Sequence, residues 1–115
     1  MFQRMTYNEA LAQRIREVLG EGPELSERKM FGGIAFMSGG NMVCGVIRDD
    51  LMVRVGPDAH EKALAEPHTR PMEMMAGRPM KGMVAVSPAG VQREDLRRWV
   101  EWGLRVARAL PAKKR

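Results

Sequence analysis

One cysteine and two histidines are the side chains of this chain with the clearest capacity for nucleophilic catalysis or metal binding. Cys44 lies in the apolar run 42–47, and the imidazoles belong to His60 and His68, both in polar sequence surroundings. A cysteine nucleophile needs a base within reach and a lowered pKa, and zinc needs three or four suitably spaced ligands. The sequence offers neither pattern, so we interpret Cys44 as a small buried hydrophobic residue. An enzyme that uses Cys44 is the alternative.

Two other motifs indicate turns rather than chemistry. Asp49 and Asp50 are adjacent carboxylates, but they separate two apolar runs, where aspartate favours turn geometry. The glycine pairs at 32–33 and 39–40 are not followed by the Lys-Ser/Thr of a phosphate-binding loop, and neither opens a helix after a parallel strand. We therefore predict no catalytic residue, no cofactor and no metal site, and we expect that the protein is not an enzyme.

Arg54 is the strongest candidate for binding a partner or an anion. In the run 51–55, apolar residues at the odd positions alternate with Met52 and Arg54, so Arg54 is expected on the sheet face away from the helices. Its guanidinium can bind a carboxylate or phosphate bidentately. A salt bridge to a neighbouring strand, for example to Glu73, is the alternative. The cations expected on the same face or edge complete a candidate patch of Lys29, Arg54, Arg78 and Lys81.

Methionine is used 11 times, and several methionines fall within the segment 72–83. Such side chains fill irregular cores or form adaptable docking surfaces. If this segment lies at a sheet edge or on an uncovered face, its methionines favour contact with a protein partner or with a second copy. We therefore include Met72 and Met74 among the candidate partner contacts, and we expect that a homodimer is one form that such a contact can take.

The chain carries a formal net charge of +5, and much of this charge lies near its C-terminal end. A basic balance attracts nucleic acid or acidic partners, and the candidate nucleic-acid contacts are Arg98, Arg105 and Arg108. The alternative is a solvated helix face followed by a frayed basic tail. Aromatic residues for base stacking make up only 5% of the chain. Nucleic-acid binding is therefore the second hypothesis, after a protein-interaction module.

Length and composition are those of one globular domain. The 115 residues are 44% hydrophobic and 29% charged, which predicts a single domain over 1–115 with a basic tail at 111–115. The longest apolar run is only a few residues, and the N-terminus has no apolar signal-peptide core. Neither a membrane partner nor secretion is therefore expected. A single cysteine fits a reducing cytoplasm.

The apolar spacing predicts three helices around two groups of strands. A capping box at Thr6 and Glu9 opens the first helix, Pro57 suits the first turn of the second, and Gly103 in the third indicates close contact with the sheet. The predicted helices are 7–19, 57–65 and 92–110. The predicted extended segments are 26–31, 33–37, 42–47, 51–55, 71–75 and 80–86, with a turn at Gly77-Arg78 in the last pair. Because only Gly32 separates the first two segments, they can form one bent strand. The expected fold is α+β, with a mainly antiparallel, five-stranded sheet and helices on one face.

Four motifs in a fixed order carry a family resemblance. They are Lys29-Met30-Phe31-Gly32-Gly33, Asn41-Met42 with Cys44-Gly45, Asp50-Leu51-Met52-Val53-Arg54-Val55, and Arg78-Pro79-Met80-Lys81-Gly82. Together they resemble the N-terminal domain family of TfoX/Sxy, a bacterial regulator of natural competence. The similarity extends over about residues 5–110, and it lies in the order and spacing of the set rather than in any one motif.

The resemblance implies a two-layer α-β(3)-α-β(2)-α fold and supplies no catalytic residues. Full-length regulators of the family carry a second, C-terminal helical domain, for which this chain has no room. We therefore expect a stand-alone domain whose role in competence does not follow from the resemblance. The expectation that remains is a cytoplasmic, regulatory module that binds a protein partner or itself.

Overall fold

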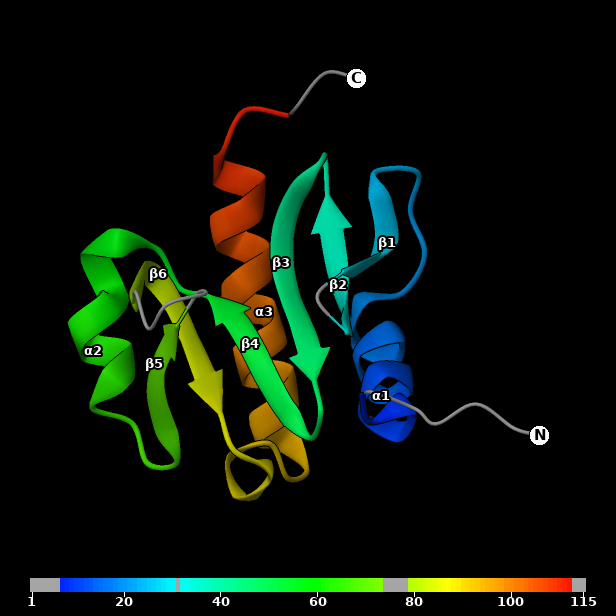
Figure 1. Cartoon of the computed structure of the whole chain (residues 1–115). Helices are drawn as coiled ribbons and strands as arrows, with labels where there is room; N and C mark the ends of the chain where they lie inside the picture. Colours follow the sequence, from blue (N-terminus) through cyan, green and yellow to red (C-terminus); the bar gives the residue numbers. More distant parts are fainter. Residues whose placement is uncertain (1–6, 31, 74–78, 113–115) are drawn as a thin grey trace.

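An open antiparallel sheet of six strands, in the order β1-β2-β3-β4-β6-β5, forms the frame of the molecule (Figure 1). This computed structural model describes residues 7–30, 32–73 and 79–112. The strands are β1 (Leu25–Met30), β2 (Gly33–Ser38), β3 (Asn41–Ile47), β4 (Asp50–Arg54), β5 (Thr69–Glu73) and β6 (Pro79–Val86). The helices are α1 (Glu9–Leu19), α2 (His60–Leu64) and α3 (Glu94–Ala109), with short 3-10 turns η1 (Pro57–Ala59) and η3 (Pro88–Gly90).

The predicted α+β class and antiparallel sheet are confirmed, but the prediction of five strands is wrong. The segments before and after Gly32 are two separate strands, β1 and β2, and not one bent strand. Gly32 has a φ of 76°, a left-handed conformation that glycine adopts without steric cost. The chain therefore reverses there, and Met30 pairs with Gly33 across the reversal. The order of elements becomes α-β(4)-α-β(2)-α.

The three helices lie within the predicted ranges but are shorter than predicted. The residue that caps the N-terminus of α1 also differs from the predicted capping box. The N-cap of α1 is Asn8, whose side-chain oxygen accepts a hydrogen bond of 3.0 Å from the Leu11 backbone N–H. The chain is still extended at Tyr7 and Asn8, because Tyr7 bridges to Arg48 and the Asn8 N–H donates to the Arg48 carbonyl. The helix can therefore begin only at Glu9, and Thr6 lies outside the described residues.

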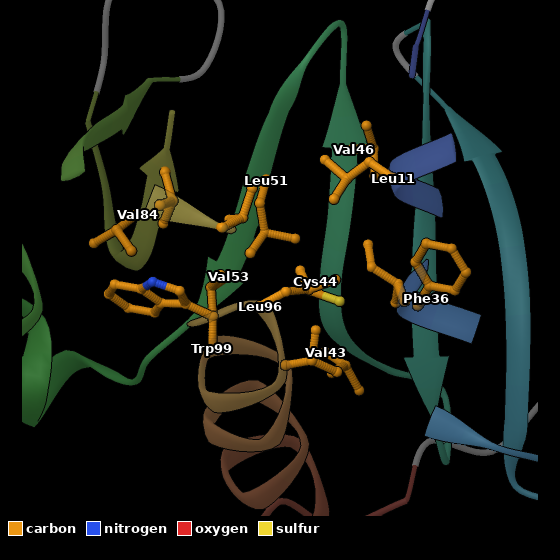
Figure 2. Packing of buried hydrophobic residues seen from close by; sticks show 14 of the residues in the cluster. Leu11, Phe36, Val43, Cys44, Val46, Leu51, Val53, Val84, Leu96 and Trp99 are labelled. Carbon is orange, nitrogen blue, oxygen red and sulfur yellow. The ribbon is translucent and has the colours of Figure 1, made fainter. Parts of the chain in front are cut away.

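All three helices contribute to one apolar core on one side of the sheet (Figure 2). Trp99 of α3, only 1% exposed, and Phe36 of β2 are its largest fully buried side chains. The close contact predicted at Gly103 is confirmed, because a Cβ built there would lie 2.3 Å from the Val43 carbonyl oxygen. In Figure 1, α3 passes behind β3 and β4. The helix backbone thus rests directly on β3.

The short helix α2 differs from the other two in position, because it contacts β5 and β6 beside the sheet rather than its centre (Figure 1). Although its neighbours in the sequence are polar, His60 is buried, with only 9% of the residue exposed. Its Nδ1 accepts a 2.9 Å hydrogen bond from the Gly82 backbone N–H, which places the ring proton on Nε2. His60 therefore fixes α2 to β6.

Gly103→Ala tests the contact between α3 and β3. Alanine favours a helix by about 1 kcal/mol over glycine, but the added methyl would overlap the Val43 carbonyl. Because overpacking a tight contact costs about 1–3 kcal/mol or more, we expect the variant to lose about 2 kcal/mol of unfolding free energy in urea denaturation.

Arg105→Ala is the matched control on the same helix, because Arg105 is exposed. Its unfolding free energy should change by no more than about 0.5 kcal/mol. A Gly103→Ala variant that is as stable as the parent protein, or more stable, would contradict the close approach of α3 to the sheet.

Candidate interaction site on the sheet face opposite the helices

A second apolar cluster lies on the sheet face opposite the helices, and we call it the methionine face. Its buried members are Met52, Met83 and Ala85, and its half-buried members are Met42, Ile47, Met72 and Met80. Every one of these residues belongs to β3, β4, β5 or β6. No residue of a described helix takes part in this cluster. Among the residues that the structure describes, the methionine face is therefore built by strands.

The two-residue period of the strands separates the two apolar clusters. In β4, Leu51 and Val53 point into the core beneath the helices, while Met52 points to the methionine face. In β6, Val84 belongs to the helix side and Met83 to the methionine face. Successive strand residues point to opposite faces, so the same strands supply leucine and valine side chains to one face and mainly methionines to the other.

The methionine face is hollowed by an apolar groove of about 160 Å³. Side chains and backbone of β2, β3 and β4 line it together with methionines of β1, β5 and β6; they include Met30, Ala35, Met42, Gly45, Met52, Met72, Met80 and Met83. Methionine is unbranched and flexible, so a surface of this composition can adapt to different apolar partners. The groove suits an apolar side chain better than a polar ligand.

Arg54 lies at the margin of this groove. As predicted from alternation, it is on the sheet face away from the helices, opposite Met83 in the register. Its Nε donates a 2.7 Å hydrogen bond to the Met42 backbone carbonyl, and its side chain is half-buried. Neither of its terminal guanidinium nitrogens is bonded to any side chain that the structure describes. The predicted alternative partner Glu73 has no described side chain.

Two further arginines share this face with Arg54. Arg28 of β1 is exposed and lies opposite Ala35, a residue that lines the groove. Arg70 of β5 lies opposite Ala85 and forms a 2.6 Å ion pair with Asp50. Directly opposed residues of antiparallel strands lie on the same face. The margin of the methionine face is therefore basic.

The predicted cationic patch is only partly brought together. Lys29 lies opposite Ile34, which belongs to the helix-side core, so its placement with Arg54 is wrong. The pKa of Glu9, on α1, is lowered mainly by its hydrogen bond with Arg16, and the charge of Lys29 makes a small contribution. Lys81 is exposed on β6. Arg78 and Met74 lie outside the described residues.

The arginines proposed for nucleic-acid contact are mostly paired with carboxylates. Arg98 lies 3.2 Å from Glu66, and its guanidinium stacks over the ring of Trp99 at 5.1 Å. Arg108 lies 3.1 Å from Glu24. Arg105 is exposed and has no ion pair with the side chains that the structure describes. This pairing reduces the positive charge that α3 offers to a polyanion.

Cys44 is fully buried on the helix side of the sheet, as predicted (Figure 2). Burial raises the pKa of its thiol, because the thiolate would lose its hydration. The adjacent carboxylates Asp49 and Asp50 have different partners. Asp49 accepts a hydrogen bond from the Asn8 side chain, and Asp50 forms an ion pair with Arg70. Among the described residues, no group of three His, Cys, Asp or Glu side chains could hold a metal ion.

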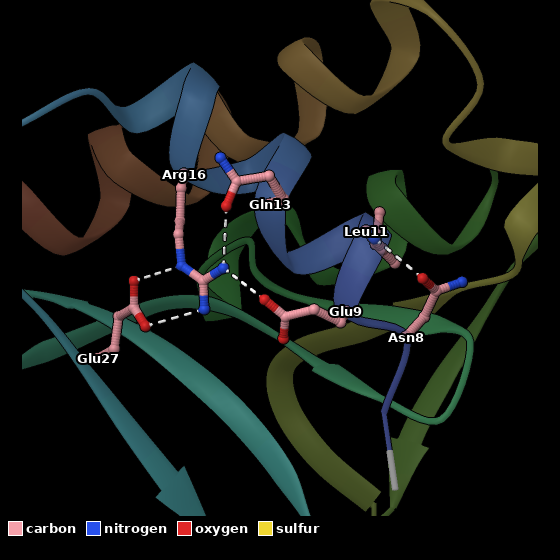
Figure 3. A network of polar contacts seen from close by, with 6 residues as sticks. All are labelled: Asn8, Glu9, Leu11, Gln13, Arg16 and Glu27. Carbon is pink, nitrogen blue, oxygen red and sulfur yellow. Dashed lines mark hydrogen bonds and ion pairs between the residues drawn. The ribbon is translucent and has the colours of Figure 1, made fainter. Parts of the chain in front are cut away.

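A polar network on the helix side was not predicted from the sequence (Figure 3). The Arg16 guanidinium of α1 lies 2.7 Å from Glu27 of β1 and 2.8 Å from Glu9, and it also donates to Gln13. These hydrogen bonds raise the pKa of Arg16, those with Glu27 first. A hollow of about 230 Å³ lies beside it, next to Phe36. Because the charged groups here satisfy one another, the network ties α1 to β1.

The sequence signal for the methionine face covers only part of that face. The sequence predicts a contact role for the methionines of 72–83, and alternation in 51–55 places Met52 on the same face as Arg54, but neither pattern predicts Met42 or Ile47 there. Met52 lies between Leu51 and Val53 of the helix-side core, whereas in β3 the adjacent residues Val43 and Cys44 both belong to that core, so strict alternation is interrupted between Met42 and Ile47. Alternation therefore predicts the face of Met52 but cannot place Met42 and Ile47 on the same face. Their assembly into one surface depends on the strand order.

Comparison with known proteins identifies one related family. The sequence model of the family described as the TfoX N-terminal domain matches residues 17–107, which include all six strands. No curated protein and no solved structure matches the chain. Within the described residues, no helix is both long and apolar enough to cross a membrane.

The burial of Cys44 predicts an unreactive thiol. At pH 8, the folded protein should react with Ellman's reagent at least about 100-fold more slowly than the protein in denaturing urea, because modification requires an opening of the core. The thiol introduced by Arg105→Cys, on the exposed side of α3, should react rapidly and serves as the control. A Cys44 that reacts as fast as this control would restore the possibility of a nucleophile.

Proposed function

The chain belongs to the TfoX N-terminal domain family, and on this premise we propose that it is a non-catalytic, cytoplasmic protein-interaction module with a regulatory role. Its methionine face is the proposed contact surface. The observation that carries this proposal is an apolar groove on a sheet face to which no described helix contributes. Apolar surface of this kind, bordered by charged residues, is typical of protein interaction sites.

The composition of the methionine face supports binding rather than structural packing alone. Burial of apolar surface contributes about 25 cal/mol for each Å² removed from water. Met42, Met72 and Met80 remain half-buried, so a partner that covers them would gain this contribution. Their flexible side chains can fit an apolar partner without large backbone movement.

The two edges of the sheet are poor alternatives for a contact. The outer strand β1 presents exposed Ser26, Glu27, Arg28 and Lys29. The other outer strand, β5, is short and contains Pro71, which lacks a backbone N–H. Charged residues and proline at an edge oppose the addition of a further strand. These features support the face of the sheet over its edges as the docking surface.

Catalysis and nucleic-acid binding have weaker support. The only thiol of the chain is buried, and burial raises its pKa. Arg97, Arg98 and Arg108 each lie within ion-pair distance of a carboxylate. Of the arginines considered for nucleic acid on α3, only Arg105 lacks such a pair among the described side chains. No feature of α3 favours a polyanion over an ordinary solvated helix face.

A photo-crosslinking experiment tests the proposed function. The photoreactive amino acid benzoylphenylalanine replaces Met72 on the methionine face or, in the control, Arg105 on α3. After irradiation in cells of the native host, the Met72 replacement should give crosslinked products of discrete mass. The Arg105 replacement should give few, because its side chain lies on the opposite side of the protein.

The mass of the product identifies the kind of partner. A product of twice the mass of the chain would mean self-association through the methionine face, and a different mass would mean another protein. Equal crosslinking from the two positions, or none from position 72, would contradict the assignment of the methionine face as a contact surface.

A further inference from the structure

We propose that the occupant of the methionine face is an amphipathic helix of a partner protein that carries acidic residues beside its apolar stripe. This inference rests on the proposed function, because it specifies what the methionine face binds. Three features of the face carry it: the charge of its margin, the geometry of Arg54, and the shape of the sheet.

The margin of the methionine face favours an acidic partner. The strand register places three arginines on this face, namely Arg28, Arg54 and Arg70. Asp50, the partner of Arg70, is the only carboxylate that the register and the described side chains place there. Since the Asp50–Arg70 pair is neutral as a unit, Arg28 and Arg54 give the margin its positive charge. An acidic partner would complement this charge and would be repelled least on approach.

Arg54 is positioned to receive a carboxylate. Its Nε is held by the Met42 carbonyl at 2.7 Å, which fixes the guanidinium plane at the edge of the groove. The two terminal nitrogens, which form the fork that binds a carboxylate bidentately, have no partner among the described side chains. Because the side chain is half-buried beside apolar residues, a carboxylate bound there would be partly shielded from water and from salt.

The shape of the sheet favours a helix over an extended segment. The two edges, with charged residues in β1 and Pro71 in β5, oppose the pairing of another strand. On the opposite face, α3 already lies across β3 and β4, so the twist of these strands accommodates a helix. Methionine-lined grooves bind the apolar face of an amphipathic helix. The helix contacts such a groove through apolar residues at positions i, i+3, i+4 and i+7.

A second copy of the chain fits this face less well. In a two-fold dimer the same surface meets itself, so Arg28 and Arg54 of each copy would approach those of the other. Asp50 is already paired with Arg70 and cannot offset them. The net charge of +5 on each chain adds to this repulsion. Charge therefore favours a different, acidic partner over self-association.

The test uses a fluorescein-labelled designed peptide of about 18 residues, or about five helical turns. Leucines stand at i, i+3, i+4 and i+7, and glutamates flank them; a control peptide carries lysines in place of the glutamates. Fluorescence anisotropy measures binding to the full chain at low salt. The glutamate peptide should bind at least about tenfold more tightly than the lysine peptide, and this preference should weaken as salt is added.

Variants of the protein locate the contact. The double variant Arg28→Glu with Arg54→Glu should lose about tenfold or more in affinity for the glutamate peptide and gain affinity for the lysine peptide. Arg105→Glu makes the same kind of charge change on α3 and should alter binding by less than about twofold. Arg54→Gln serves if the double variant does not fold, as judged by near-ultraviolet circular dichroism.

The methionine methyl groups report where the peptide binds. In ¹³C-methyl spectra, addition of the glutamate peptide should shift the signals of Met42, Met52, Met72 and Met83. The inference is overturned if the two peptides bind equally, if the variants do not reverse the preference, or if the methyl signals stay unchanged. Crosslinking from position 72 together with such a result would leave the proposed contact surface intact and reject only the acidic helix. A chain that is dimeric through this face would reject it in favour of self-association.

Discussion

The close contact between α3 and β3 is the constraint on which the rest of the structure depends. Gly103 brings the helix backbone onto the Val43 carbonyl, which leaves no room for a side chain between them. Trp99 and Leu96 of the same helix can then reach the valines of the central strands. The large, rigid side chains of the protein are thereby committed to one side of the sheet, and the opposite side is left to other residues.

The two sides of the sheet differ in the kind of apolar side chain that each contains. The helix side is filled by β-branched and aromatic residues, which have few rotamers and form a core of unique geometry. The other side is filled by methionines, which have several rotatable bonds and tolerate changes of neighbour. In the proposed function, this flexibility lets the methionine face fit a partner. A core with this composition would be less well defined.

Local pattern was enough to predict much of the fold and part of the site. The period of the apolar residues gave the three helices and the extended segments, and alternation in β4 gave the face on which Arg54 lies. The misplacement of Lys29 had a different origin. Its face depends on how β1 registers against β2, and a shift of one residue moves every side chain to the opposite face. The cap at Asn8 was missed because the contact of the preceding residues with Arg48, far along the chain, decides where α1 begins.

The sequence by itself determined the class of the fold, the burial of Cys44 in an apolar strand and the need for a small residue at Gly103, because these follow from spacing between near neighbours. The tertiary structure alone decided which charges are paired and which apolar residues share a surface. Arg108 pairs with Glu24, 84 positions away in the chain, and the four strands of the methionine face lie in the sheet in the order β3-β4-β6-β5, which differs from their order in the chain. These long-range contacts depend on strand order and register, which are set by the free energy of the whole core rather than by any local segment.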